Sequence, residues 1–333
     1  MKKLVNDVHD VVKESLEGFE TAHADTIKVN FDPDFVVRAQ PKEDGKVGLV
    51  SGGGSGHEPL HGGYVGYGML DAAVPGAVFT SPTPDPIVEA TKAADHGAGV
   101  LHIVKNYTGD VLNFETAAEL CEMEDIEVAT VVVNDDVAVE DSLYTAGRRG
   151  VAGTFLVEKI AGAAAERGDD LNAVAKIAQA VNDNCRSMGL ALGPCTVPHA
   201  GKPSFDLGET EVEMGIGIHG EPGYRRTEMK TADELATELY EKVTSDLPFE
   251  EGDDVIVLVN GMGGTPLSEL YIINRKVQQL MKKDGLNPVR TIVGDYVTSL
   301  EMPGCSLTFL RVHDDMLELF DAPTNTPGYR KGM

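Results

Sequence analysis

The sequence has no tryptophan and only four cysteines in 333 residues, and the cysteines lie far apart, at positions 121, 185, 195 and 305. No two of them have the CxxC spacing of a thiolate metal site, and they are too few for a disulfide framework. The sequence therefore argues against a small disulfide-stapled domain and against structural zinc. We predict no metal site on this chain, and a reducing compartment fits this cysteine usage.

Long apolar stretches are also missing. No run approaches the roughly 18 consecutive apolar residues that a membrane helix needs. The N-terminus, MKKLVNDVHDVVKESLEG, mixes acidic residues into an amphipathic pattern, which is not the pattern of a signal peptide. We expect a cytoplasmic protein with no membrane contact.

Basic residues are scarce, with 28 Lys and Arg against 54 Asp and Glu, for a net charge of -26. Such a charge repels nucleic acid and anionic membranes, so neither is an expected partner. The acidic residues are spread along the whole chain and the apolar periodicity persists around them, which argues against disorder. We interpret the excess as the solvated shell of a protein from a halophilic organism, because salt screens the self-repulsion.

Short apolar runs that end in turn signals alternate with helical patterns. The runs predict strands at 46–50, 100–104, 128–133 and 255–259, and the patterns predict helices at 114–124, 153–168, 171–185 and 267–285. This alternation predicts an α/β fold with partly parallel sheets. A stretch rich in Pro and Gly near 190–210 marks a junction. We therefore expect two lobes, residues 1–190 and 191–333, each a sheet flanked by helices.

The glycine-rich segment SGGGSGHE, residues 51–58, follows the first predicted strand. It lacks the lysine of a P-loop and the glycine spacing of a dinucleotide fingerprint. We predict a strand-to-helix turn in which the backbone of Gly54, Ser55 and Gly56 approaches a ligand, with the imidazole of His57 at its end. The alternative is a tight turn that binds nothing.

The segment KNYTGD, residues 105–110, stands at the carboxyl end of another predicted strand, where α/β sheets bind ligands. Asp110 could take a proton from a hydroxyl, and Lys105 could bind an oxygen or hold a carboxylate. The alternative for Asp110 is a cap on the following helix. TSPTPDP, residues 80–86, is expected to be a rigid, non-helical loop. Arg148 and Arg149 could form surface ion pairs or a docking patch.

The segment EMGIGIHGEPG, residues 213–223, places one imidazole among four glycines. Strand alternation would put Gly215, Gly217 and His219 on one face, which the glycines would empty beside the imidazole. No HxH or HExxH pattern accompanies His219, so a metal ligand is disfavoured. We favour a nucleophile or hydrogen-bonding group in a small-molecule pocket. The alternative is a structural histidine of a strand.

Together with GLVSGGGSGHEPLHG, FTSPTPDPI, VKNYTGDVLNFETA, DSLYTAGRRGVAGT and FDAPTNTP, these segments resemble the dihydroxyacetone kinase family over nearly the whole chain. The resemblance is to its dihydroxyacetone-binding K subunit and implies the two-lobed fold of Dak1 and DegV-like proteins. It implies that His219 forms a covalent hemiaminal with the ketone carbon of dihydroxyacetone, and that His57 and Asp110 are catalytic through hydrogen bonding and proton transfer. The implied substrate-binding set is Gly54, Ser55, Gly56, His57, Lys105, Asp110 and His219.

The resemblance also implies the partners. The chain carries no nucleotide-binding motif, and in this family ADP or ATP with Mg²⁺ is held on a separate L subunit, so no cofactor is expected on this subunit. A phosphotransferase-type M protein and a homodimer are further implications. A non-catalytic co-regulator that senses dihydroxyacetone is the main alternative. Fatty-acid binding on a similar scaffold is disfavoured by the polar, glycine-rich segments at the strand ends.

Overall fold

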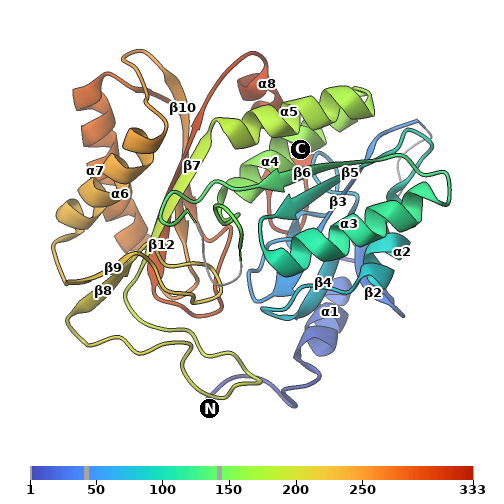
Figure 1. Ribbon diagram of the computed structural model, residues 1–333, viewed down its shortest axis with the longest axis horizontal. Helices are drawn as coiled ribbons and strands as arrows, with labels where there is room; N and C mark the ends of the chain where they lie inside the picture. Colours follow the sequence, from blue (N-terminus) through green and yellow to red (C-terminus); the bar gives the residue numbers. More distant parts are fainter. Residues whose placement is uncertain (1, 41–44, 141–144, 333) are drawn as a thin grey trace.

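The computed structural model describes residues 2–40, 45–140 and 145–332. Within these ranges the chain forms two six-stranded sheets and one two-stranded sheet, with helices around and between the two large ones (Figure 1). The first large sheet ends with a strand at Val133, and the second begins with a strand at Cys185. The structure confirms the predicted α/β fold of partly parallel sheets flanked by helices.

The first sheet has the strand order β1-β2-β4-β3-β5-β6. Strands β4, β3, β5 and β6 run parallel to one another, whereas β1 and β2 add an antiparallel edge. The bounds are β1 Ile27–Phe31, β2 Asp34–Arg38, β3 Gly48–Ser55, β4 Ala72–Val78, β5 Val100–Lys105 and β6 Val128–Val133. The predicted strand at 128–133 has these bounds in the structure, and that at 100–104 is one residue longer.

The second sheet has the order β11-β10-β12-β7-β8-β9, and only its β10–β11 pair is parallel. A small sheet near the C-terminus joins β13 Thr324–Asn325 to β14 Arg330–Lys331. The bounds of the large sheet are β7 Cys185–Ala191, β8 Glu211–Met214, β9 Arg225–Glu228, β10 Asp254–Gly261, β11 Asn287–Gly294 and β12 Gly304–Arg311. The change of sheet thus precedes β7, somewhat before the expected junction at residue 190.

The helices form three layers around the sheets (Figure 1). Helices α2 and α3 cover the outer face of the first sheet, α6 and α7 cover the outer face of the second, and α4 and α5 lie between the sheets. The bounds are α1 Val11–Ala22, η1 Gly62–Tyr64 (a 3₁₀ turn), α2 Pro84–Ala94, α3 Thr108–Glu122, α4 Gly153–Arg167, α5 Leu171–Asp183, α6 Ala232–Asp246, α7 Leu267–Asp284 and α8 Met316–Asp321.

Helix α4 is buried on all sides. Each residue from Gly153 to Ala165 is buried, because the helix contacts strands of both large sheets. At Gly162 a Cβ would lie 2.7 Å from the carbonyl oxygen of Gly68, so only glycine allows this approach. One apolar cluster includes Leu49 from the first sheet, Phe155 from α4 and Leu258 from the second sheet. The two lobes therefore share a core.

Two loop predictions need correction. The segment 80–86 is not wholly non-helical, because α2 begins at Pro84. Two of its three prolines, Pro84 and Pro86, occupy the first turn of α2, where the backbone N–H that proline lacks has no helical acceptor. Helix α3 begins at Thr108, six residues before the predicted start, so Asp110 lies within its first turn and Tyr107 takes the N-cap position.

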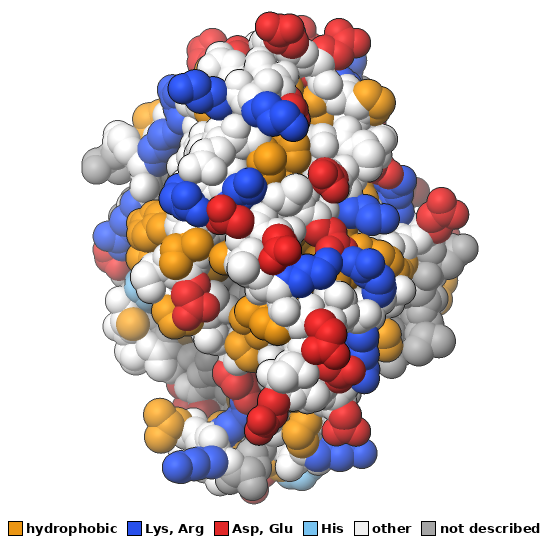
Figure 2. Space-filling view, turned by 90° about the vertical axis from the view of Figure 1, so that its left-hand side faces the viewer, with side chains coloured by type: hydrophobic (Ala, Val, Ile, Leu, Met, Phe, Trp, Pro, Cys, Tyr) orange, Lys and Arg blue, Asp and Glu red, His pale blue; other side chains and the backbone are white. Residues whose placement is uncertain are grey.

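No described helix is both long enough and apolar enough to span a membrane. On the face covered by α6 and α7, Lys and Arg side chains lie interspersed with Asp and Glu (Figure 2). This face therefore carries charges of both signs, although the net charge of the whole chain is -26.

Salt is expected to stabilise this fold. The Debye length falls from about 10 Å at 0.1 M ionic strength to about 3 Å at 1 M, so added KCl screens repulsion among the acidic residues. We expect the midpoint of thermal unfolding, followed by circular dichroism, to rise by at least about 5 °C between these concentrations. Near pH 4.6, the sequence pI, the gain should shrink. A midpoint that falls with KCl at neutral pH would contradict the halophile interpretation.

Candidate active site

The predicted site residues lie in loops and at the ends of strands and helices that the two sheets bring together. His57 follows the carboxyl end of β3, and Asp110 lies just after β5. Because β3 and β5 are parallel neighbours, their carboxyl ends share one edge of the sheet. His219 comes from the loop after β8 in the second sheet, and its ring centroid lies 4.7 Å from that of His57. Histidines from the two lobes are therefore in contact.

Two aromatic rings complete the surroundings of His219. The imidazole stands edge-on to Tyr107 and Phe79, with centroid separations of 4.5 and 5.3 Å. Phe79 also stacks on His57 at 5.1 Å, with an interplanar angle of 15°. These contacts limit the rotation of both imidazoles. Neither ring was predicted as part of the site, although Tyr107 lies inside the KNYTGD segment.

The hydrogen bonding of His57 fixes which of its nitrogens is free. Its Nδ1 lies 2.8 Å from the carbonyl oxygen of Thr298, so Nδ1 must carry the proton and donate it. Burial lowers the pKa of His57 well below its ordinary value, and the nearby His219 and Lys105 lower it further. The ring is therefore neutral, and its Nε2, buried with no protein partner among the described residues, is a bare acceptor.

Glu221 faces the Nδ1 atom of the His219 ring. Its carboxylate accepts a 2.8 Å hydrogen bond from the backbone N–H of His219 and lies 3.5 Å from Nδ1. Burial by itself raises the pKa of Glu221, but His219 and Arg149 outweigh it and lower this pKa to about 2. An ionised carboxylate beside Nδ1 favours the tautomer protonated there. The Nε2 lone pair of His219 is thus left available.

Arg149 supports this carboxylate from behind. Arg149 is fully buried, donates 2.7 Å hydrogen bonds to Asp136 and to the carbonyl of Gly215, and lies 4.0 Å from Glu221. Burial raises the pKa of Asp136 to about 6, against the lowering effect of Arg149. Both surface interpretations of this arginine were wrong. Glu221 was not predicted as a site residue, although it is an acidic residue only two positions after His219.

The glycines near His219 do not clear space for a ligand. Strand β8 ends at Met214, so the alternation predicted through residue 219 was wrong. A Cβ at Gly217 would overlap the carboxylate of Glu221, and a Cβ at Gly215, where φ is +79°, would lie 2.9 Å from the ring of Tyr224. The glycines make room for neighbouring side chains, and at 217 that neighbour is the partner of His219.

A methyl group at residue 217 is expected to impair the site without unfolding the protein. In Gly217→Ala the Glu221 side chain must move from its place beside His219, whereas the backbone at 217 needs no left-handed conformation. We expect turnover to fall about 10- to 100-fold, the range seen when a partner that orients a histidine is lost. Gly18→Ala is the matched control, because no atom lies within 4 Å of its Cβ. Full activity in Gly217→Ala would contradict this role of Glu221.

The glycine-rich segment belongs to a strand, not to a strand-to-helix turn. Strand β3 continues to Ser55, because the glycines pair with β4 and β5 on either side. A Cβ at Gly53 would overlap Nζ of Lys105, and a Cβ at Gly54 would lie 2.5 Å from the backbone nitrogen of Thr80. Glycine at these positions lets the Lys105 side chain and the loop after β4 approach strand β3.

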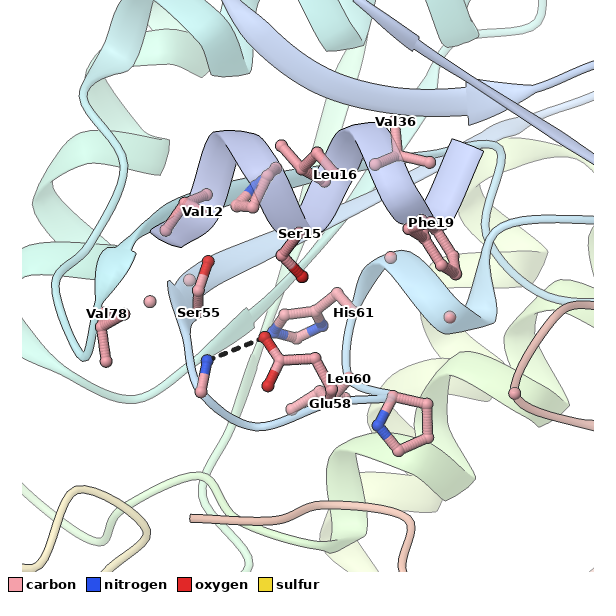
Figure 3. Close-up of a pocket in the computed structure, with 18 of the residues that line it drawn as sticks. Val12, Ser15, Leu16, Phe19, Val36, Ser55, Glu58, Leu60, His61 and Val78 are labelled. Atoms are coloured by element: carbon pink, nitrogen blue, oxygen red, sulfur yellow. Dashed lines mark hydrogen bonds between the residues drawn. The ribbon is translucent and has the colours of Figure 1, made fainter. Parts of the chain in front are cut away.

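Part of the predicted backbone cradle is already hydrogen-bonded within the protein. The N–H of Gly56 donates to Glu58 at 2.9 Å (Figure 3), and the Ser55 hydroxyl donates to the carbonyl of Gly76 at 2.7 Å. The Gly54–Gly56 backbone lies between Phe79 on one side and a cavity of about 500 Å³ on the other. Helix α1 covers this cavity, which His57, Lys105, Asp110 and His219 do not line.

Lys105 and Asp110 stand together beneath Gly53. Both side chains are buried, and Nζ of Lys105 lies 3.7 Å from the Asp110 carboxylate. The second carboxylate oxygen, Oδ1, is buried without a hydrogen-bond partner among the described residues. A buried acceptor without a partner is costly, so a ligand hydroxyl at Oδ1 would be stabilising. In the described part of the chain, no group of three or more His, Cys, Asp or Glu is placed to hold a metal ion.

The sequence matches the Dak1 domain family over residues 17–328. It is 55% identical over 323 residues to the dihydroxyacetone-binding subunit of PTS-dependent dihydroxyacetone kinase 1 from Listeria innocua. That alignment covers 96% of this chain and 98% of the relative. These matches confirm the resemblance to the dihydroxyacetone kinase family.

Two solved structures share the fold over nearly the whole chain. The dihydroxyacetone kinase operon co-activator superposes with a TM-score of 0.91 at 35% identity, covering 98% of this chain and all of that one. The dihydroxyacetone kinase of C. freundii with AMP-PNP and Mg²⁺ gives 0.90 at 33% identity, covering 99% of this chain and 61% of that one. A DegV family protein of Corynebacterium glutamicum, at 13% identity and a TM-score of 0.52 over 81% of this chain and 98% of that one, shows a likeness of fold alone. The chain belongs to the Dak1 domain family.

Proposed function

We propose that this chain is the dihydroxyacetone-binding subunit of a dihydroxyacetone kinase. It binds dihydroxyacetone as a hemiaminal on His219 and presents a hydroxyl for phosphorylation. The observation that carries this proposal is the setting of the His219 ring, with Nδ1 facing the Glu221 carboxylate and the edge of the ring against His57. The 55% identical relative carries the name of such a subunit.

The covalent step begins at Nε2 of His219. Its lone pair attacks the ketone carbon, a C–N bond forms, and the π pair moves onto the ketone oxygen. The proton count balances because that oxygen gains one proton while Nδ1 releases one. Until Nδ1 does so the ring is cationic, and the Glu221 carboxylate 3.5 Å away stabilises that charge.

The two other catalytic residues act on oxygen atoms of the substrate. The bare Nε2 of His57 accepts a hydrogen bond from a hydroxyl. Asp110 takes the proton from the terminal hydroxyl as that oxygen attacks the phosphoryl group of the donor, whose bond to its leaving phosphate oxygen would break, and Lys105 binds an adjacent oxygen of the substrate. In this proposal the substrate also contacts the backbone of Gly54, Ser55 and Gly56.

A covalent link explains how so small a substrate is selected. Dihydroxyacetone and glycerol present similar hydroxyl groups, but only the ketone has a carbon that an imidazole can attack, so the bond rejects glycerol. The link also fixes the terminal hydroxyl near Asp110. Positioning of this kind corresponds to effective molarities of roughly 10⁵–10⁸ M.

The phosphoryl group must come from a partner. In this proposal a separate L subunit holds ADP or ATP with Mg²⁺, and a phosphotransferase-type M protein recharges that nucleotide. The name of the PTS-dependent relative supports a phosphotransferase partner, and the kinase structure with AMP-PNP and Mg²⁺, of whose chain this one covers 61%, supports a nucleotide site outside this chain. The subunit acts as a homodimer in the cytoplasm.

The second candidate is a co-regulator that senses dihydroxyacetone without phosphorylating it. The similarity to the operon co-activator favours this candidate, because that structure gives a TM-score of 0.91. The fold alone does not separate the two functions. The presence of buried His57 and Asp110 together with the partly buried His219 favours the kinase, because a sensor needs no base for phosphoryl transfer.

A coupled assay tests the proposal. The chain is mixed with an L subunit, an M protein, Mg²⁺ nucleotide and phosphoenolpyruvate, and dihydroxyacetone phosphate is followed. We expect turnover that depends on this chain and is absent with glycerol. If no donor supports turnover while dihydroxyacetone still binds, the sensor function replaces the kinase function.

A further inference from the structure

Lys105 has a closer partner than the aspartate beside it. Its Nζ lies 2.8 Å from Nε2 of His61 and 3.4 Å from the carbonyl oxygen of Gly52, whereas Asp110 is 3.7 Å away. Lys105 is fully buried, so its position depends on these neighbours and not on water. His61 is the strongest of them by distance, yet the chemistry proposed above makes no use of it.

His61 in turn contacts a buried carboxylate. Its Nδ1 lies 2.6 Å from Oε1 of Glu158 in α4 and 3.0 Å from Oγ of Ser51 in β3. The Ser51 hydroxyl already donates to the carbonyl of Ile103 at 2.6 Å, so its oxygen can only accept from His61. An ammonium group can only donate. Nε2 of His61 must therefore accept from Lys105, and Nδ1 donates to Glu158.

These three residues form one hydrogen-bonded chain, from Lys105 through His61 to Glu158. His61 also borders the cavity beneath α1, where its ring lies between Ser15 and Glu58 (Figure 3). Glu158 is fully buried on the central helix. The chain thus runs from the middle of the shared core to the edge of the substrate site.

Burial penalises the charge at each end of this chain. It raises the pKa of Glu158 to about 8, and it lowers the pKa of Lys105 against the opposing effects of Asp110 and Glu158. Burial and the neighbouring Lys105 hold the pKa of His61 well below its ordinary value, so the ring between them is neutral. Passing one proton from Lys105 through His61 to Glu158 would neutralise both ends without changing the number of protons. The two charges therefore depend on each other.

We propose that His61 and Glu158 are positioning residues that hold the Lys105 ammonium against the substrate beside Gly53. This inference rests on the proposed function, because it assigns the task of that ammonium to dihydroxyacetone. The geometry agrees, since a Cβ on Gly53 would overlap Nζ of Lys105 and would lie 3.6 Å from Nε2 of His61. The Lys105 end of this hydrogen-bonded chain therefore lies directly against Gly53 of strand β3.

The test measures KM and kcat for dihydroxyacetone in the coupled assay with His61→Leu, Glu158→Leu and Glu158→Gln. The two leucine variants should raise KM about tenfold or more, with a smaller change in kcat, because a hydrogen bond to a charged group is lost. The amide of Glu158→Gln can still accept from Nδ1, so its KM should lie between wild type and Glu158→Leu. A general loss of packing would not restore KM in this order.

His102→Leu is the matched control. His102 is also a fully buried histidine, it lies on β5 three residues before Lys105, and its Nε2 bonds to Thr91 at 2.9 Å. Its ring packs against Phe114, which belongs to a different core cluster. This variant should lose stability while leaving KM unchanged. Where a leucine variant does not fold, Ser51→Ala and Glu158→Gln replace it as the milder pair.

The two proposals fail in different ways. A wild-type chain that neither binds nor turns over dihydroxyacetone would overturn the proposed function. A wild-type chain that turns over, together with folded His61 and Glu158 variants of unchanged KM, would overturn the positioning role alone.

Discussion

His219→Ala is expected to end both covalent capture and turnover. The substitution removes the imidazole whose Nδ1 faces Glu221, and with it the Nε2 atom that bonds the ketone carbon in the proposed mechanism. Loss of a covalent nucleophile lowers kcat by on the order of 10³-fold or more. The adduct is measured as continuous electron density between residue 219 and dihydroxyacetone in soaked crystals, and turnover in the coupled assay.

The control for this variant is His199→Ala. His199 is exposed and makes an edge contact with His9, which is far from the residues of the candidate site in the sequence, so the removal of the His199 ring should leave adduct and turnover intact. Covalent density on a different residue of His219→Ala would show that the nucleophile was assigned wrongly. The protein should still unfold cooperatively, because the His219 side chain is only partly buried.

Asp110→Asn is expected to separate binding from catalysis. The amide keeps the size of the buried side chain and can still receive a hydrogen bond, but it cannot take the hydroxyl proton. We expect the adduct on His219 to persist while kcat falls about 10²- to 10⁴-fold, the usual contribution of general base catalysis. Crystal soaks check the adduct, and steady-state kinetics with saturating dihydroxyacetone checks kcat.

Glu115→Gln serves as the comparison for Asp110→Asn. Glu115 is a carboxylate on the same helix, α3, but it is exposed. Its removal should change neither adduct nor kcat. If Asp110→Asn kept wild-type kcat, the base would have to be sought elsewhere in the cluster, with His57 as the next group to test.

Much of the fold follows from local sequence patterns. The strand at 128–133 and the helices beginning at 153, 171 and 267 are predicted because their apolar periodicity and end signals agree with their burial. Gly168 and Gly285, the last residues of two of the predicted helices, adopt positive φ and terminate them. These features depend on residues that are neighbours in the sequence, so a single sequence is enough to predict them.

The misses depend on neighbours in space. The glycines of residues 52–54 predict a turn by their own flexibility, yet two flanking strands hold them extended. Arginine is usually a surface residue, but Arg149 is buried and donates hydrogen bonds to Asp136 and to the carbonyl of Gly215. Glu158 lies in an otherwise apolar helical pattern, and its partner His61 is far away in the sequence. A local sequence pattern does not predict contacts between residues that are so far apart in the sequence.

The burial of α4 between the two sheets has a further consequence. His57 and His219 belong to different lobes, and this helix is part of the core that those lobes share. Heating that loosens this core would separate the imidazoles while each sheet still kept its hydrogen bonds. Thermal inactivation should therefore precede the loss of secondary structure, and the working temperature limit of the protein would be set by the fit between its halves.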